Sequence, residues 1–269
     1  VMELRKQTDC GMMECKKALT EADGNFEKAI EILRERGLAT AAKKASRTAA
    51  EGMVYADYCP QCKVGVVIEV NAETDFVAKN DKFIEFADQV LEAAIAAKAE
   101  TVEELLAAPA GDETVQDLVN NMGAVIGEKI EIGNVSRVEG ENVELYLHQT
   151  SADLPAQVGV LVATNEAGAD LAHDVAMHVA AFSPAYLDRD SVPAEDLEKE
   201  RETLTKLTLS EGKPEHIVPK IVEGRMNAFY SENCLVDQDF ARDPSKTVGE
   251  VLKAQDAEVT KFVRFQVGA

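Results

Sequence analysis

Residues 64–71 of this chain read VGVVIEVN, and residues 158–165 read VGVLVATN, 94 positions further on. Each stretch is a run of apolar and β-branched residues that ends at asparagine, which is typical of a buried strand. Each stretch is also followed by an alanine-rich helical pattern. The repeat therefore predicts a core built from a duplicated strand–strand–helix unit, and with it an α+β fold.

The first copy has about seven extra residues between its strand and its helix. The strands match at an offset of 94 residues, whereas the helices match best at an offset of 87. The extra residues fall around 72–79, which read AETDFVAK. A loop present in only one copy is not explained by packing that both copies share, and loops on rigid scaffolds commonly carry function. The residues alone leave Phe76 open between an exposed interface aromatic and a ring folded under the loop.

The segments on either side of the repeat divide the chain further. Residues 1–48 predict a small N-terminal domain of three helices with its linker, in which Gly37 is placed to end the third helix. Residues 38–48 would then form a tether. The remaining predicted units are a core N-subdomain (49–135), a core C-subdomain (136–183 with 231–269) and an inserted antiparallel helical hairpin (184–230).

The predicted hairpin consists of two charged helical stretches, at about 194–210 and 215–229. Apolar residues at helical spacing are expected to face each other across it: Leu197, Leu204, Leu207, Leu209, Ile217, Ile221, Val222 and Met226. A protruding arm must cover its apolar stripe, so we expect that the hairpin supports homodimer formation.

Composition excludes several classes of partner. The formal net charge is −21, and such a surface repels phosphate backbones, so no direct nucleic-acid partner is expected. No apolar run approaches the ~18 residues of a membrane helix, and the charged first residues do not resemble a signal peptide. We therefore expect a cytoplasmic protein with no membrane partner.

Five scattered cysteines argue against a disulfide framework and for a reducing compartment. Cys59 and Cys62 form a single C-x-x-C at the turn between two predicted strands, 53–58 and 64–70. A structural zinc ion needs four ligands, and no second pair at suitable spacing exists. Two free thiols at a hairpin tip are therefore the prediction, with a zinc or redox site as the alternative.

Catalytic motifs are missing from the chain. It contains no G-x-x-x-x-G-K-[ST] phosphate loop and no H-E-x-x-H zinc pair, since His173 and His178 are five residues apart. No serine or cysteine has the context of a nucleophile elbow. We therefore expect a protein that is not an enzyme, with no catalytic residue, no bound metal and no cofactor.

Several stretches resemble the bacterial elongation factor Ts family. Residues 11–19, GMMECKKAL, are similar to its N-terminal signature, and residues 69–79, EVNAETDFVAK, to its second signature. Residues 221–226 and 243–249 are similar to its C-terminal half. The resemblance covers nearly the whole chain, and it implies a ubiquitin-associated-like N-terminal domain, two related α+β core subdomains and an inserted coiled-coil-like hairpin.

The resemblance also implies a partner, the GTPase elongation factor Tu, and an activity, guanine-nucleotide exchange during translation elongation. Thr74, Asp75, Phe76 and Val77 match the family loop that enters the GTPase domain near its Mg²⁺ and switch region. Leu4, Met12, Met13 and Lys16 match positions at which the N-terminal domain binds the same GTPase domain.

His148 would lie near a further contact surface, although a longer loop follows it here than in many relatives. The alternative function is an adaptor that uses its helical domain without exchange activity. The loop at 74–77 favours exchange, because an adaptor has no need of it.

Overall fold

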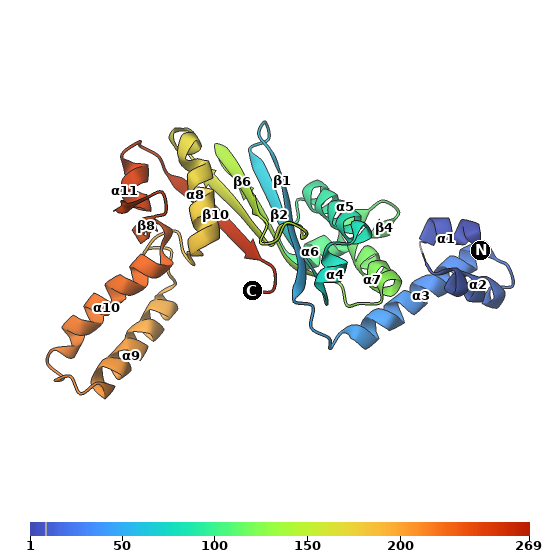
Figure 1. Ribbon diagram of the computed structural model, residues 1–269, viewed down its shortest axis with the longest axis horizontal. Helices are drawn as coiled ribbons and strands as arrows, with labels where there is room; N and C mark the ends of the chain where they lie inside the picture. Colours follow the sequence, from blue (N-terminus) through green and yellow to red (C-terminus); the bar gives the residue numbers. More distant parts are fainter. Residues whose placement is uncertain (9) are drawn as a thin grey trace.

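The computed structural model describes residues 1–8 and 10–269 and has a mixed α+β architecture, which confirms the predicted fold class. Figure 1 shows an elongated molecule in which the N-terminal helices and a helical hairpin lie at opposite ends, with two β-sheets between them. The exact boundaries of the four units stay predictions. Within the described part of the chain, no helix combines the length and the apolar character needed to cross a membrane.

Each copy of the sequence repeat forms the central strand of its own three-stranded antiparallel sheet. These central strands are β2 (Val64–Ala72) and β7 (Val158–Thr164), and nearly all of their residues are buried. Burial on both faces explains why both stretches are almost continuously apolar. The flanking strands are β1 (Glu51–Cys59) and β5 (Glu131–Glu139) in the first sheet, and β6 (Asn142–His148) and β10 (Val259–Gln266) in the second.

Residues at equivalent positions of the two copies face equivalent layers. Val67 of β2 and its counterpart Leu161 of β7 lie in the core between the two sheets. Ile68 and Val162 point the other way, each into a core beneath an outer layer of helices. The outer helices are α5 (Asp81–Ala97), α6 (Val102–Ala107) and α7 (Val115–Ile126) on the first sheet, and α8 (Ala169–Phe182) and α11 (Val248–Lys253) on the second.

The extra residues of the first copy are present where the repeat places them. Helix α5 begins ten residues after Asn71, whereas α8 begins four residues after the equivalent Asn165. A single helical turn, α4 (Asp75–Ala78), occupies the longer connection, and a 3₁₀ turn (Glu166–Gly168) occupies the shorter one. The remaining short elements are β3 (Pro109–Ala110), β4 (Glu113–Thr114), β8 (Asp239–Phe240), β9 (Asp243–Thr247) and a 3₁₀ turn (Leu235–Asp237).

The N-terminal helices are α1 (Met2–Thr8), α2 (Met12–Glu21) and α3 (Phe26–Lys44). The prediction that the third helix ends at Gly37 and leads into a tether is wrong, because α3 continues to Lys44. Gly37 is buried where α3 approaches α7, and a Cβ added to it would lie 3.6 Å from the side-chain oxygen of Asn121. The alanine-rich residues that follow are good helix formers, so the helix continues along α7.

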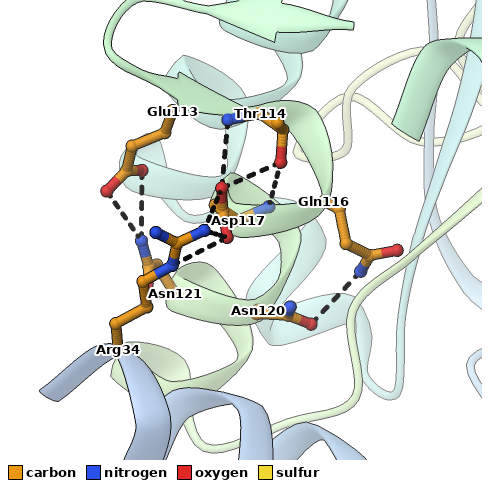
Figure 2. A network of polar contacts seen from close by, with 7 residues as sticks. All are labelled: Arg34, Glu113, Thr114, Gln116, Asp117, Asn120 and Asn121. Atoms are coloured by element: carbon orange, nitrogen blue, oxygen red, sulfur yellow. Dashed lines mark hydrogen bonds and ion pairs between the residues drawn. The ribbon is translucent and has the colours of Figure 1, made fainter. Parts of the chain in front are cut away.

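Helix α3 is attached to α7 by two polar contacts, and Figure 2 shows the one between Arg34 and Asp117. Asp117 and Lys44 are buried, whereas 58% of the Arg34 side chain is exposed. Arg34 donates to both carboxylate oxygens of Asp117, at 2.8 and 3.0 Å. Burial alone would raise the pKa of Asp117, but hydrogen bonds from Thr114 and Arg34 outweigh it and hold that pKa below its usual value. Lys44 donates from Nζ to the carbonyl oxygen of Gly123 at 2.8 Å, and desolvation lowers the pKa of this lysine.

The helical hairpin consists of α9 (Ala194–Ser210) and α10 (Val218–Asn233). Four of the eight predicted apolar residues pack in its core: Leu197, Leu204, Val222 and Met226. The prediction for Leu207 and Leu209 is wrong, because these side chains are 48% and 44% exposed. The turn after Leu204 directs Thr208 inward instead, where its hydroxyl donates to the carbonyl oxygen of Leu204 and accepts from Arg225.

The tip of the β1–β2 hairpin carries a disulfide between Cys59 and Cys62, so the prediction of two free thiols there is wrong. The antiparallel ladder continues to the pair Cys59–Val64, and the tight turn beyond it holds the two cysteine Cα atoms 5.1 Å apart. This separation lies within the range that a disulfide spans.

We expect Gly159→Ala to lower the free energy of unfolding by about 1–3 kcal/mol, because a Cβ at this position would lie 2.4 Å from Cγ1 of the buried Val54. Urea denaturation measures the change. Gly224→Ala in α10 is the control: its added Cβ meets no atom within 4 Å, so it should stabilise the protein by about 0.4–1 kcal/mol. Equal unfolding free energies for wild type and Gly159→Ala would contradict the close approach of the strands.

Candidate functional site

The loop that follows β2 presents one aromatic ring to solvent. Thr74 is the N-cap of α4, and its hydroxyl accepts a hydrogen bond from the backbone N–H of Val77. Val77 and Ala78 are buried and anchor the turn on the first core, whereas Phe76 is 74% exposed. The structure therefore resolves the alternative that the residues left open, since the ring lies on the surface. We call residues 73–79 the TDFV loop.

Glu128, which follows the C-cap of α7, holds the TDFV loop in place. Its carboxylate accepts hydrogen bonds from the backbone N–H groups of Glu73 and Thr74, at 3.1 and 3.0 Å, and from the Thr74 hydroxyl at 2.7 Å. Glu73 reciprocates by accepting from the backbone N–H of Lys129 at 2.5 Å, and it also pairs with Arg47. The backbone hydrogen bond from Lys129 is the main reason that the pKa of Glu73 lies below its usual value.

Lys79 is the positively charged side chain beside the exposed ring of Phe76. Its ammonium group lies 5.2 Å from the centroid of Phe76, which is a cation–π distance, and 3.6 Å from the carboxylate of Asp75. It also pairs with Asp153, at 3.2 Å, and this hydrogen bond is the main cause of the raised pKa of Lys79. Asp153 belongs to the long loop after β6, in the second half of the core. The Lys79–Asp153 ion pair therefore joins the end of the TDFV loop to that half.

The N-terminal residues singled out by the sequence fall into two groups. Met12 and Met13 are 48% and 63% exposed on α2, and Lys16 is exposed on the same helix. We call these three residues the α2 surface. Leu4 is fully buried in the core of the N-terminal helices, so in this structure it supports α2 from within and offers no side-chain surface to a partner.

The two predicted groups do not form one pocket. Helices α2 and α4 lie apart in Figure 1, and the exposed side chains are Met12 and Met13 on α2 and Phe76 on α4. His148 is exposed at the end of β6, where Nδ1 lies 3.1 Å from the hydroxyl of Tyr146. In the ranges 1–8 and 10–269, no three His, Cys, Asp or Glu side chains are grouped as a metal site. The exposed predicted residues therefore form two separate groups, one on α2 and one on the TDFV loop.

Sequence reasoning missed the residues that hold the TDFV loop, namely Glu128, Lys79 and Asp153. Glu128 and Asp153 lie 54 and 74 positions from their partners in the loop, Thr74 and Lys79, in a chain rich in carboxylates. Lys79 lies within the quoted loop itself, and its spacing of four from Asp75 was a usable signal of an ion pair.

Comparison with known proteins agrees with this architecture. The sequence model of the family described as elongation factor TS matches residues 73–269. Proteins named elongation factor Ts from Micrococcus luteus, Paenarthrobacter aurescens and Beutenbergia cavernae are 52%, 51% and 50% identical to this chain. Each alignment covers 100% of this chain and 97% of the relative. Fold and relatives together define a translation elongation factor. The chain belongs to the elongation factor Ts family.

We expect Glu128→Ala to speed amide hydrogen exchange in the TDFV loop by about ten- to a hundredfold, because hydrogen bonds to a charged group are worth about 1.5–3 kcal/mol and this carboxylate accepts three. Mass spectrometry of peptides that cover the loop measures the effect. Glu131→Ala, which removes the ion-pair partner of Lys129 Nζ, is the control and should leave the loop protected. Unchanged exchange in Glu128→Ala would show that the loop is held by other contacts.

Proposed function

We propose that this protein is a guanine-nucleotide exchange factor that binds elongation factor Tu and promotes GDP release during translation elongation. The observation that carries the proposal is Phe76, a large apolar ring held in solvent on a braced turn. Family membership supports the partner. In this proposal the protein is a cytoplasmic binding factor that is not itself an enzyme, and it uses no cofactor or metal of its own.

The proposed mechanism is differential binding. A factor that binds the nucleotide-free GTPase more tightly than the GDP-bound form must weaken GDP binding by the same factor. Phe76 inserts into the GTPase domain near its Mg²⁺ and switch region, and Asp75 places a negative charge beside the metal site. In the free protein Asp75 is paired with Lys79, so this pair must loosen or reorganise as the carboxylate meets the partner.

The magnitudes require more than one contact. Burying a phenylalanine is worth roughly 1.5–3 kcal/mol, which corresponds to about ten- to a hundredfold in an equilibrium. A larger acceleration therefore needs the charge of Asp75 and a second point of attachment that keeps the ring in place. The α2 surface is the proposed second point, since exposed methionines adapt well to a partner surface.

Two further properties belong to the same proposal. The exposed Leu207 and Leu209 near the end of α9 support self-association through the helical hairpin. The net charge of −21 supports the absence of a direct nucleic-acid partner.

The competing function is an adaptor that binds a partner through the α2 surface without changing its nucleotide affinity.

We expect Phe76→Ala to reduce the acceleration of GDP release by about ten- to a hundredfold, because the variant loses the burial of the ring in the partner. Complex formation should be partly retained through the α2 surface. Release of fluorescent GDP from elongation factor Tu, with and without this protein, is the measurement. Tyr58→Ala, which removes another exposed aromatic near the opposite end of the same sheet, is the control.

Two outcomes would contradict the proposal at different levels. Unchanged GDP release with Phe76→Ala would refute the role of the ring. Binding of elongation factor Tu by the wild-type protein without any acceleration of release would refute exchange and favour the adaptor.

A further inference from the structure

Helix α7 contacts the elements that lie behind both proposed contact surfaces. In its first turn, Asp117 binds Arg34 of α3, and α3 packs against the helix that carries the α2 surface. Just after its last turn, Glu128 binds the backbone of the TDFV loop. The two surfaces are therefore connected through one twelve-residue helix with a polar attachment at each end.

The attachment of Arg34 has a defined geometry (Figure 2). The guanidinium donates from Nη2 to both carboxylate oxygens of Asp117 and from Nε to one of them, at 2.8, 3.0 and 3.2 Å. The same carboxylate accepts from the backbone N–H and the hydroxyl of Thr114, in the capping box that begins α7. Asp117 is therefore held from two directions, and only 9% of its side chain is exposed.

A second attachment lies near the other end of the contact between the helices. Lys44 donates from a buried Nζ to the carbonyl oxygen of Gly123. Arg34 and Lys44 are ten residues apart on α3, which is about 15 Å along a helix. Gly37 lies between them at the close approach to α7. Two attachments this far apart oppose both tilting and rotation of α3 on the core.

We propose that Arg34 and Asp117 are positioning residues, which fix the α2 surface relative to the TDFV loop so that one partner molecule engages both at once. The inference rests on the proposed function. When two binding surfaces are held at the right separation, the second contact forms within the complex and at a high effective concentration. Loss of the Arg34–Asp117 pair frees the N-terminal helices to reorient, so association weakens while the TDFV loop itself is unchanged.

The test is nucleotide exchange on elongation factor Tu at increasing concentrations of Arg34→Met. We expect the concentration for half-maximal exchange to rise by about tenfold and the maximal rate of GDP release to stay that of the wild type. Lys43→Met, which removes a positive charge from an exposed position on the same helix, is the matched control and should behave as the wild type. Arg34→Lys should show a smaller rise in the half-maximal concentration than Arg34→Met, since lysine keeps the charge but cannot make the bidentate contact with Asp117.

A double-mutant cycle separates positioning from a general loss of stability. In a background with Met12→Ala, Met13→Ala and Lys16→Ala the α2 surface is already lost, so adding Arg34→Met should change the half-maximal concentration less than twofold. Asp117→Asn keeps an acceptor for the Thr114 cap but loses the charge. It should reproduce the effect of Arg34→Met, and the two changes together should add nothing further.

Three results would overturn the inference. The first is an unchanged half-maximal concentration in Arg34→Met, and the second is a lower maximal rate of GDP release in that variant. The third is an effect of Arg34→Met that is as large in the background without the α2 surface as in the wild type. Affinity for the GTPase, measured by calorimetry, distinguishes this failure from failure of the proposed function. If the wild type binds but does not accelerate release, exchange is refuted. The affinities of wild type and Arg34→Met would then still decide whether Arg34 positions the α2 surface.

Discussion

The close face-to-face contact of β2 and β7 is the constraint on which the other elements depend. Gly65 and Gly159 occupy the same position in the two repeats, and a Cβ on either would lie within 3 Å of a side-chain carbon of the opposite sheet. Because neither residue has a side chain, the two sheets can pack closely against each other. Both central strands are then buried on both faces. Each sheet then has one outer face left, and the helices that cover these faces complete the four layers.

This layered core provides a rigid base for the TDFV loop. β2 runs directly into the TDFV loop, so the turn begins at the end of a fully buried strand. Glu128 adds a support from α7, and Asp153 adds one from the second half of the core through Lys79. The loop is consequently attached to both repeats, although only one of them contains it.

Much of this arrangement follows from the sequence by local rules. The repeat predicted the two central strands, the offset between strands and helices located the TDFV loop, and the alanine-rich pattern after each strand predicted α5 and α8. These features depend on residues close together in the chain. The continuation of α3 past Gly37 was missed because a buried glycine at a helix contact has the same local pattern as one that ends a helix.

Long-range polar contacts could not be predicted for a different reason. Arg34 and Asp117 are 83 residues apart, and each belongs to a common residue type with many equivalent alternatives in the chain. Pairing them requires knowledge of how α3 lies on α7, where Gly37 permits the close approach of the two helices. The exposure of Phe76 could not be decided either, since the local pattern is the same whether the ring is covered or not.

The TDFV loop is held by hydrogen bonds to Glu128, by the Lys79–Asp153 pair and by the buried Val77 and Ala78. The Phe76 ring, in contrast, is 74% exposed. The residue proposed to meet the partner is thus distinct from the residues that keep the loop folded. Substitutions at the ring leave the contacts that fold the loop in place, so under the proposed function the tip can change together with the GTPase. A binding surface built in this way can diverge with its partner while the architecture beneath it stays constant.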